Sequence, residues 1–141
     1  MVDKFNQIFQ GDDQSKDKVI LVVDDDEISR KILYGILYRL WYKIDEADDW
    51  RKALFLIEIY KSKLLCVVLD YQMPDMTWLQ VAEQLKLIWC EVETIMVTWN
   101  TIEKAILEKL WINLCLKKPL TPDSINYLLE HVKNLSKRKN S

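Results

Sequence analysis

Short apolar runs rich in β-branched residues recur along this chain and limit the folds that it can adopt. The clearest are VILVV at 19–23, LLCVVLD at 64–70 and TIMVT at 94–98, and weaker ones cover 42–46 and 112–116. Runs of this length and composition are typical of strands buried on both faces of a parallel sheet. The sequence therefore predicts five buried strands.

Helical spacing separates these runs. Apolar residues recur every three or four positions from Ile28 to Leu40, which predicts a first helix over about 29–39. Thr121, Pro122 and Asp123 open the last helix with an N-cap residue, a proline in the first turn and a favourable acid. Other helices are expected over about 53–59, 77–88 and 101–110, and the last one ends near 135. Because strands and helices alternate, we predict an α/β three-layer sandwich, with a five-stranded parallel sheet and five helices on its two faces.

The chain has 141 residues, half of them apolar, which is enough for one folded domain. We expect this domain at 18–136, after a polar, flexible N-terminal segment at 1–17 and before a basic tail at 137–141. No apolar run approaches the roughly 20 residues of a membrane span, and the N-terminus is too polar for a signal peptide. A net charge of -2 without a basic stripe argues against nucleic-acid partners. We therefore expect a cytoplasmic protein that binds neither membranes nor nucleic acid.

The cysteines and the histidine carry little functional signal. Cys66, Cys90 and Cys115 are far apart in the chain, which predicts inert thiols rather than a disulfide framework or a metal site. His131 is the only histidine, and we expect it to be a surface residue of the last helix.

Polar residues with catalytic potential follow four of the predicted strands. They are the acids at 24–26, Asp70, Thr98 and Lys118. Ligands of parallel α/β sheets bind at the carboxyl ends of the strands, so these groups should share one pocket. Carboxylates held close together repel one another, and a hard divalent cation such as Mg²⁺ relieves that repulsion. With a hydroxyl and an ammonium beside it, Asp70 would suit the role of a carboxylate nucleophile in phosphoryl transfer.

The motifs LVVDDDEISRKIL, VVLDYQMPDM, IMVT and LKKPL occur in this order over about 18–135. They resemble the motifs of response-regulator receiver domains of two-component signalling, including the chemotaxis regulators. The resemblance implies a flavodoxin-like, doubly wound sheet with strand order 2-1-3-4-5. It also implies the following roles: phosphoacceptor for Asp70, metal-binding acidic pair for Asp24 and Asp25, metal-binding carbonyl for Gln72, switch hydroxyl for Thr98 and phosphate contact for Lys118.

By the same resemblance the chain is a signalling module that catalyses at most its own phosphorylation and dephosphorylation. Its phosphoryl donor would be a histidine kinase or a histidine phosphotransfer protein, its cofactor Mg²⁺, and its output a changed surface that a downstream protein recognises. Members of the family carry a cis peptide at the position of Lys118 and Pro119. Gln72 and Asn100 match positions that tune the lifetime of the phosphoryl group.

Two departures from the family pattern stand out. Cys115 occupies the fifth-strand position where many relatives carry the tyrosine or phenylalanine that rotates inward on activation. The six tryptophans fall where the family has or accepts glycine, and we expect none of them in a helix core or a strand: Trp41, Trp50, Trp78, Trp89, Trp99 and Trp111. Trp41, Trp89 and Trp111 follow predicted helices, where glycine usually supplies a left-handed cap. Trp99 follows Thr98 directly and would crowd the phosphoryl pocket.

Our hypothesis for this placement is that the six tryptophans correspond to UGA codons that the host organism reads as glycine. In some bacteria UGA is read as glycine, and translating such a gene with UGA as tryptophan would produce this pattern. UGG codons at the six positions, or a native intact mass with six tryptophans, would contradict the hypothesis.

Two other protein classes fit these residues less well than a receiver does. A haloacid-dehalogenase-like phosphatase also uses a strand-end aspartate, but it needs a second carboxylate two residues later, where Gln72 stands. A nucleotide-binding protein needs a glycine-rich loop after the first strand, where this chain has acids. The main alternative is a receiver that does not accept phosphate and acts as a protein-binding scaffold.

Overall fold

The computed structural model describes residues 17–70, 77, 80, 83, 93–109 and 112–139. Five parallel strands form one sheet in the order β2-β1-β3-β4-β5, which confirms the predicted order. The strands are β1 (Val19–Val23), β2 (Lys43–Ala47), β3 (Leu64–Leu69), β4 (Thr94–Thr98) and β5 (Leu114–Lys117). β2 begins one residue and β5 two residues later than expected, as is common for element ends.

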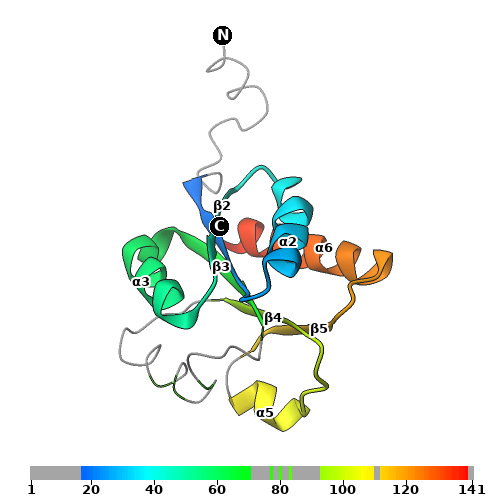
Figure 1. Cartoon of the computed structure of the whole chain (residues 1–141). Coiled ribbons are helices and arrows are strands. Elements are labelled where there is room, and N and C mark those ends of the chain that lie inside the picture. The colour runs from blue at the N-terminus through cyan, green and yellow to red at the C-terminus, as the bar shows by residue number, and fades with distance from the viewer. Residues whose placement is uncertain are drawn as a thin grey trace.

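Helices cover both faces of this sheet (Figure 1). They are α2 (Glu27–Tyr38), α3 (Trp50–Tyr60), α5 (Lys104–Lys109) and α6 (Pro122–Lys139), with a short 3₁₀ turn, η2 (Lys61–Lys63), after α3. The helix expected at 77–88 lies almost wholly outside the described residues, but Thr77 and Gln80 exchange the two hydrogen bonds of a capping box at its start. Among the described residues, no helix is long and apolar enough to cross a membrane.

α6 ends at Lys139 rather than near residue 135. Its last turns hold lysine and arginine, which are good helix formers and favour the negative end of the helix dipole. The predicted start of this helix is confirmed, because the hydroxyl of Thr121 accepts a hydrogen bond from the Ser124 amide at 3.1 Å.

Two apolar layers hold the helices to the sheet, one on each face. α2 and α6 pack on one face, where Leu37 and Leu128 are fully buried, and α3 packs on the other through Ala53 and Ile57. All five residues of β1 are buried, because alternate side chains enter opposite layers. Burial of one such leucine or isoleucine contributes roughly 1.5–3 kcal/mol. Packing on both faces explains the continuous apolar runs in the sequence.

Trp41 follows α2 with a backbone φ of 66°, in the left-handed region. The prediction of a left-handed cap at this position is confirmed. Its amide donates to the carbonyl of Tyr38 at 3.1 Å, and its indole is 63% exposed. A bulky residue is strained in this conformation by roughly 1–2 kcal/mol, whereas glycine is not.

Trp50 contradicts the expectation that no tryptophan lies in the core. It is the first residue of α3 and is completely buried in the layer between this helix and the sheet. The reason is that α3 begins three residues after β2 ends, so its first turn still faces the sheet. Trp99 is exposed, and Trp78, Trp89 and Trp111 lie outside the described residues.

His131 is half-buried rather than a surface residue, which corrects the expectation from the sequence. It lies on α6, and its Nε2 atom is buried without a hydrogen bond to any described residue. Burial lowers the pKa of His131, the charge of Glu93 opposes that effect and Arg138 adds to it, so the net direction is downward. Glu93 directly precedes β4, so Glu93 and the neighbouring His131 lie at the amino-terminal edge of the sheet. Asp24 and Asp70 lie at the opposite, carboxyl-terminal edge.

Replacing Trp41 with glycine should relieve the strain of the left-handed backbone at this position. We expect Trp41→Gly to unfold with a free energy about 1 kcal/mol higher than Trp41→Ala, because only glycine relieves the left-handed backbone. Chemical denaturation measures the difference. Alanine is the control, since it removes the same ring contact with Tyr38 and keeps the Cβ atom. Equal stability of the two variants would contradict the assignment of strain to this backbone.

Candidate functional site

Asp24 is the first residue after β1 and is completely buried. Its backbone amide donates to the carbonyl of Ala47 at 3.1 Å, which attaches it to the end of β2. One carboxylate oxygen, Oδ1, accepts from the amide of Asp26 at 2.9 Å, and the other, Oδ2, accepts from Lys118 Nζ at 2.7 Å. Neither the backbone nor the carboxylate of Asp24 is therefore free to rotate.

Asp70 is the first residue after β3, the strand next to β1. Its amide donates to the carbonyl of Val23 at 3.1 Å, so the ends of the two strands are joined directly. Lys118 Nζ also donates to Asp70 Oδ2, at 3.0 Å. The lysine and Asp70 are each only 8% exposed, so one buried ammonium bridges carboxylates from two strands.

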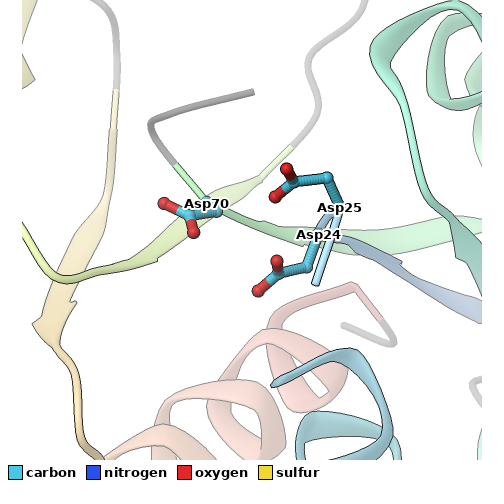
Figure 2. A group of neighbouring side chains, drawn as sticks. All are labelled: Asp24, Asp25 and Asp70. Carbon is cyan, nitrogen blue, oxygen red and sulfur yellow. The ribbon is translucent and has the colours of Figure 1, made fainter. Parts of the chain in front are cut away.

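Asp25 lies on the solvent side of Asp24 and Asp70, with which it forms the acidic group. It is exposed, and Figure 2 shows its carboxylate together with those of Asp24 and Asp70 at the ends of β1 and β3. One carboxylate oxygen from each residue lies within 4.8 Å of the others. Hard oxygen donors at this spacing suit Mg²⁺, which prefers one or two carboxylates with water and phosphate oxygens. The residues present therefore fit a divalent cation.

The buried charges influence one another strongly. Burial raises the pKa of Asp24, and its hydrogen bonds from Lys118 and Asp26 offset only part of that effect. For Lys118, burial by itself lowers the pKa, but the hydrogen bonds and charges of Asp24 and Asp70 outweigh it and the net direction is upward. The ammonium thus stays protonated and supplies the positive charge that the acids require.

Thr98 lies at the end of β4 and is buried. Its hydroxyl accepts a hydrogen bond from the Asn100 amide at 3.3 Å, and its carbonyl accepts one from the Lys118 amide at 2.8 Å. The peptide between Lys118 and Pro119 is cis, as the resemblance implied. Four strand ends therefore place Thr98, Lys118 and the acids at one edge of the sheet, as the sequence predicted.

Gln72 and Trp99 are two further residues that the sequence places at the site. Gln72, the expected carbonyl ligand, lies outside the described residues. Trp99, which was expected to crowd the pocket, leaves 60% of its surface to solvent.

Sequence reasoning missed the roles of Asp26, Arg30 and Glu46 near the site. Asp26 was expected among the pocket acids, but it is not part of the group that Asp24, Asp25 and Asp70 form. Asp26 caps α2, with its carboxylate accepting from the Ser29 amide at 3.1 Å, and the side-chain and amide hydrogen bonds of Ser29 lower the pKa of Asp26. Arg30 donates to the carbonyl of Asp24 at 2.8 Å and to Glu46 Oε1 at 3.2 Å. The cap has a sequence signal, an aspartate directly before a helical pattern. The contact of Arg30 with Glu46 has none, because it joins residues 16 positions apart.

The response regulator receiver domain family matches residues 20–130, and the chain belongs to this family. It is 30% identical over 119 residues to the sensor histidine kinase RcsC of Salmonella typhi, which covers 83% of the chain and 12% of the relative's length. The receiver domain of the sensor histidine kinase PA1611 from Pseudomonas aeruginosa has a TM-score of 0.70 at 17% identity, covering 84% of this chain and 97% of that one.

The receiver domain of Ssk1 from Saccharomyces cerevisiae, solved together with the phosphotransfer protein Ypd1, has a TM-score of 0.73 at 17% identity. The match covers 88% of this chain and 92% of that one. At this identity the two structures show the shared fold alone. Receiver domains are signalling modules rather than classical enzymes, and the predicted family and fold are confirmed.

Removing the Lys118 ammonium should destabilise the fold in a pH-dependent way. We expect Lys118→Met to lose about 3 kcal/mol of unfolding free energy at about pH 7, because two buried carboxylates lose their cation. Without the cation, the pKa of Asp24, which burial already raises, makes the folded state bind protons more readily than the unfolded state. The stability is then regained as the pH falls, so the deficit should shrink towards about pH 5.

Urea denaturation of wild type and variant at both pH values measures this effect. Lys117→Met is the matched control, since this neighbouring ammonium is exposed and donates to the Thr101 hydroxyl at 3.0 Å. A deficit in Lys118→Met that is independent of pH, or as large in the control, would contradict the electrostatic explanation.

Proposed function

We propose that Asp70 accepts a phosphoryl group in a reaction that requires Mg²⁺. The observation that carries this proposal is the group of three carboxylates within 4.8 Å of one another, two of which share the buried ammonium of Lys118. The proposed metal ligands are the carboxylates of Asp24, Asp25 and Asp70 and the carbonyl of Gln72. The proposed contacts to the phosphoryl oxygens are Thr98 and Lys118.

The related structures support the cofactor and the donor. The PA1611 receiver domain was solved with a magnesium ion coordinated in its active-site cleft. The Ssk1 receiver domain was solved in complex with a histidine phosphotransfer protein, and RcsC is a sensor histidine kinase. We therefore propose a histidine kinase or a histidine phosphotransfer protein as the phosphoryl donor of this chain. Because the chain spans 12% of the length of RcsC, it corresponds to one module of that relative.

In this reaction a carboxylate oxygen of Asp70 attacks the phosphorus atom of a phosphohistidine. The bond from phosphorus to the imidazole nitrogen breaks, and its electron pair stays on the imidazole. When bound, Mg²⁺ neutralises charge on the phosphoryl oxygens. Lys118 is positioned to neutralise another oxygen, because its ammonium already contacts Asp70 Oδ2 at 3.0 Å. Burial of Asp70 and Lys118 excludes bulk water and strengthens this attraction.

The proposed output is a two-state rearrangement that begins at Thr98. In the structure its hydroxyl is engaged by the Asn100 amide. The hydroxyl oxygen is the acceptor in that contact, so a phosphoryl group on Asp70 would add a charged acceptor for the O–H proton of Thr98. The loop after β4 would then follow Thr98, and a downstream protein would recognise the changed surface.

Incubation with acetyl phosphate and Mg²⁺ tests the proposal. We expect intact-mass spectrometry to show the addition of one phosphoryl group to the wild type, and none to Asp70→Asn or when EDTA is present. Asp48→Asn is the matched control, because this aspartate is exposed and lies outside the acidic group. No addition to the wild type would refute the proposal and favour the non-phosphorylated scaffold.

A further inference from the structure

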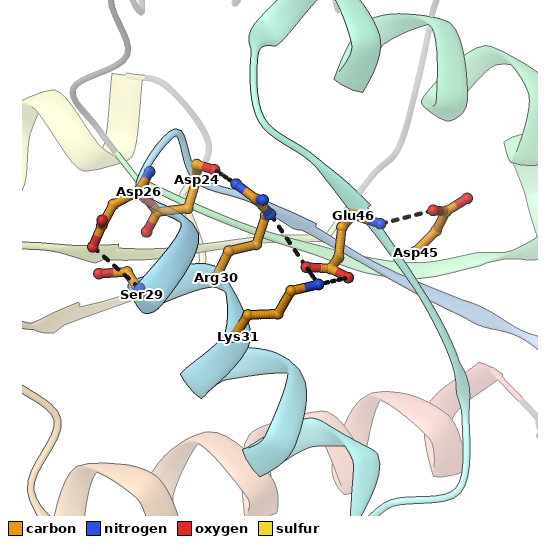
Figure 3. Close-up of polar contacts among 7 residues, drawn as sticks. All are labelled: Asp24, Asp26, Ser29, Arg30, Lys31, Asp45 and Glu46. Atoms are coloured by element: carbon orange, nitrogen blue, oxygen red, sulfur yellow. Dashed lines mark hydrogen bonds and ion pairs between the residues drawn. The ribbon is translucent and has the colours of Figure 1, made fainter.

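Arg30 connects the acidic group to β2. It lies in the first turns of α2, and only 14% of its side chain is exposed. Its Nη1 atom donates to the carbonyl of Asp24 at 2.8 Å, and its Nε atom donates to Glu46 Oε1 at 3.2 Å (Figure 3). One guanidinium therefore holds the main chain of a site residue and a carboxylate near the end of the neighbouring strand.

The contact with the Asp24 carbonyl constrains two residues. This carbonyl belongs to the peptide that joins Asp24 to Asp25, and a peptide unit is planar. A hydrogen bond that directs the carbonyl therefore also sets the rotation of the whole unit. The amide of Asp24 is already held by the Ala47 carbonyl at 3.1 Å. With both contacts in place, the orientation of the main chain that carries the two carboxylates is restrained.

We infer that Arg30, oriented by Glu46, is a positioning residue for divalent cation binding by Asp24 and Asp25. This inference rests on the proposed function, since it needs a cation at the acidic group. Arg30 acts through the peptide of Asp24 and does not touch the cation. Its own positive charge would oppose a cation, but the carboxylate of Glu46 offsets it.

The planar fork of the guanidinium explains why an arginine serves here. Nε and Nη1 point in different fixed directions, so one side chain reaches both the Asp24 carbonyl and Glu46. The single ammonium of a lysine keeps the charge but does not reproduce this pair of contacts. Arg30→Lys therefore separates the effect of geometry from the effect of charge.

Lys31 provides a matched control from the next position in the chain. Its ammonium contacts the same Glu46 carboxylate, at 3.0 Å from Oε2, but its side chain is 58% exposed. Among the described residues its ammonium contacts Glu46 and the ring of Tyr34 rather than the acidic group. Lys31→Ala thus removes a cation from Glu46 without disturbing the Asp24 peptide.

The test measures Mn²⁺ binding to the full chain by electron paramagnetic resonance of the free ion, with Mg²⁺ as competitor. We expect Arg30→Lys and Arg30→Ala to bind Mn²⁺ about tenfold more weakly, as is typical when a residue that orients a metal ligand is lost. Lys31→Ala should stay close to the wild type, and Asp25→Asn should lose most of the binding. All measurements are made well below the melting temperature of each variant, so that only folded protein is compared.

The outcomes separate the inference from the proposed function. Wild-type binding that Asp25→Asn abolishes and Arg30→Lys leaves unchanged would overturn the role of Arg30 and keep the cation site. Tighter binding by Arg30→Ala would also overturn it, because charge alone would then explain the effect. A lower melting temperature with unchanged affinity would make Arg30 merely structural. No binding by the wild type would overturn the cation site and this inference together.

Discussion

The Lys118 ammonium, shared by Asp24 and Asp70, is the interaction on which the site depends. It joins the residue after β5 to the residues after β1 and β3, at 2.7 Å and 3.0 Å. Two carboxylates buried at neighbouring strand ends would otherwise repel each other in a medium of low dielectric constant. The same ammonium supplies a positive charge to both carboxylates, and Asp25 lies at the solvent side, where a cation can approach.

Several contacts around Lys118 fix the chain at the carboxyl end of β1. The Asp26 cap begins α2 directly after the acids, and Arg30 returns from that helix to the Asp24 carbonyl. β2 contributes through the Ala47 carbonyl and Glu46. The edge strand β2 carries no predicted catalytic residue. It nevertheless helps to hold Asp24 in place, through the Ala47 carbonyl and through Glu46.

Much of the fold and of the candidate site was predictable, for a local reason. Strands buried on both faces need continuous apolar runs, and VILVV and TIMVT are each wholly buried. Because ligands of parallel sheets bind at the carboxyl ends of the strands, the sequence also placed Asp24, Asp70 and Lys118 at one site. The errors at Trp50 and His131 have a common source, because each side chain turns towards a neighbouring element that sequence spacing does not reveal.

The sequence alone determined the order of strands and helices, the polar groups at the strand ends and the left-handed backbone at Trp41. Each of these follows from local pattern or from the geometry of parallel sheets. Only the tertiary structure decided which partners those groups have. The contact of Lys118 with Asp24 spans 94 positions and that of Arg30 with Glu46 spans 16. Such contacts form because packing brings the strand ends together, and no short segment of sequence encodes them.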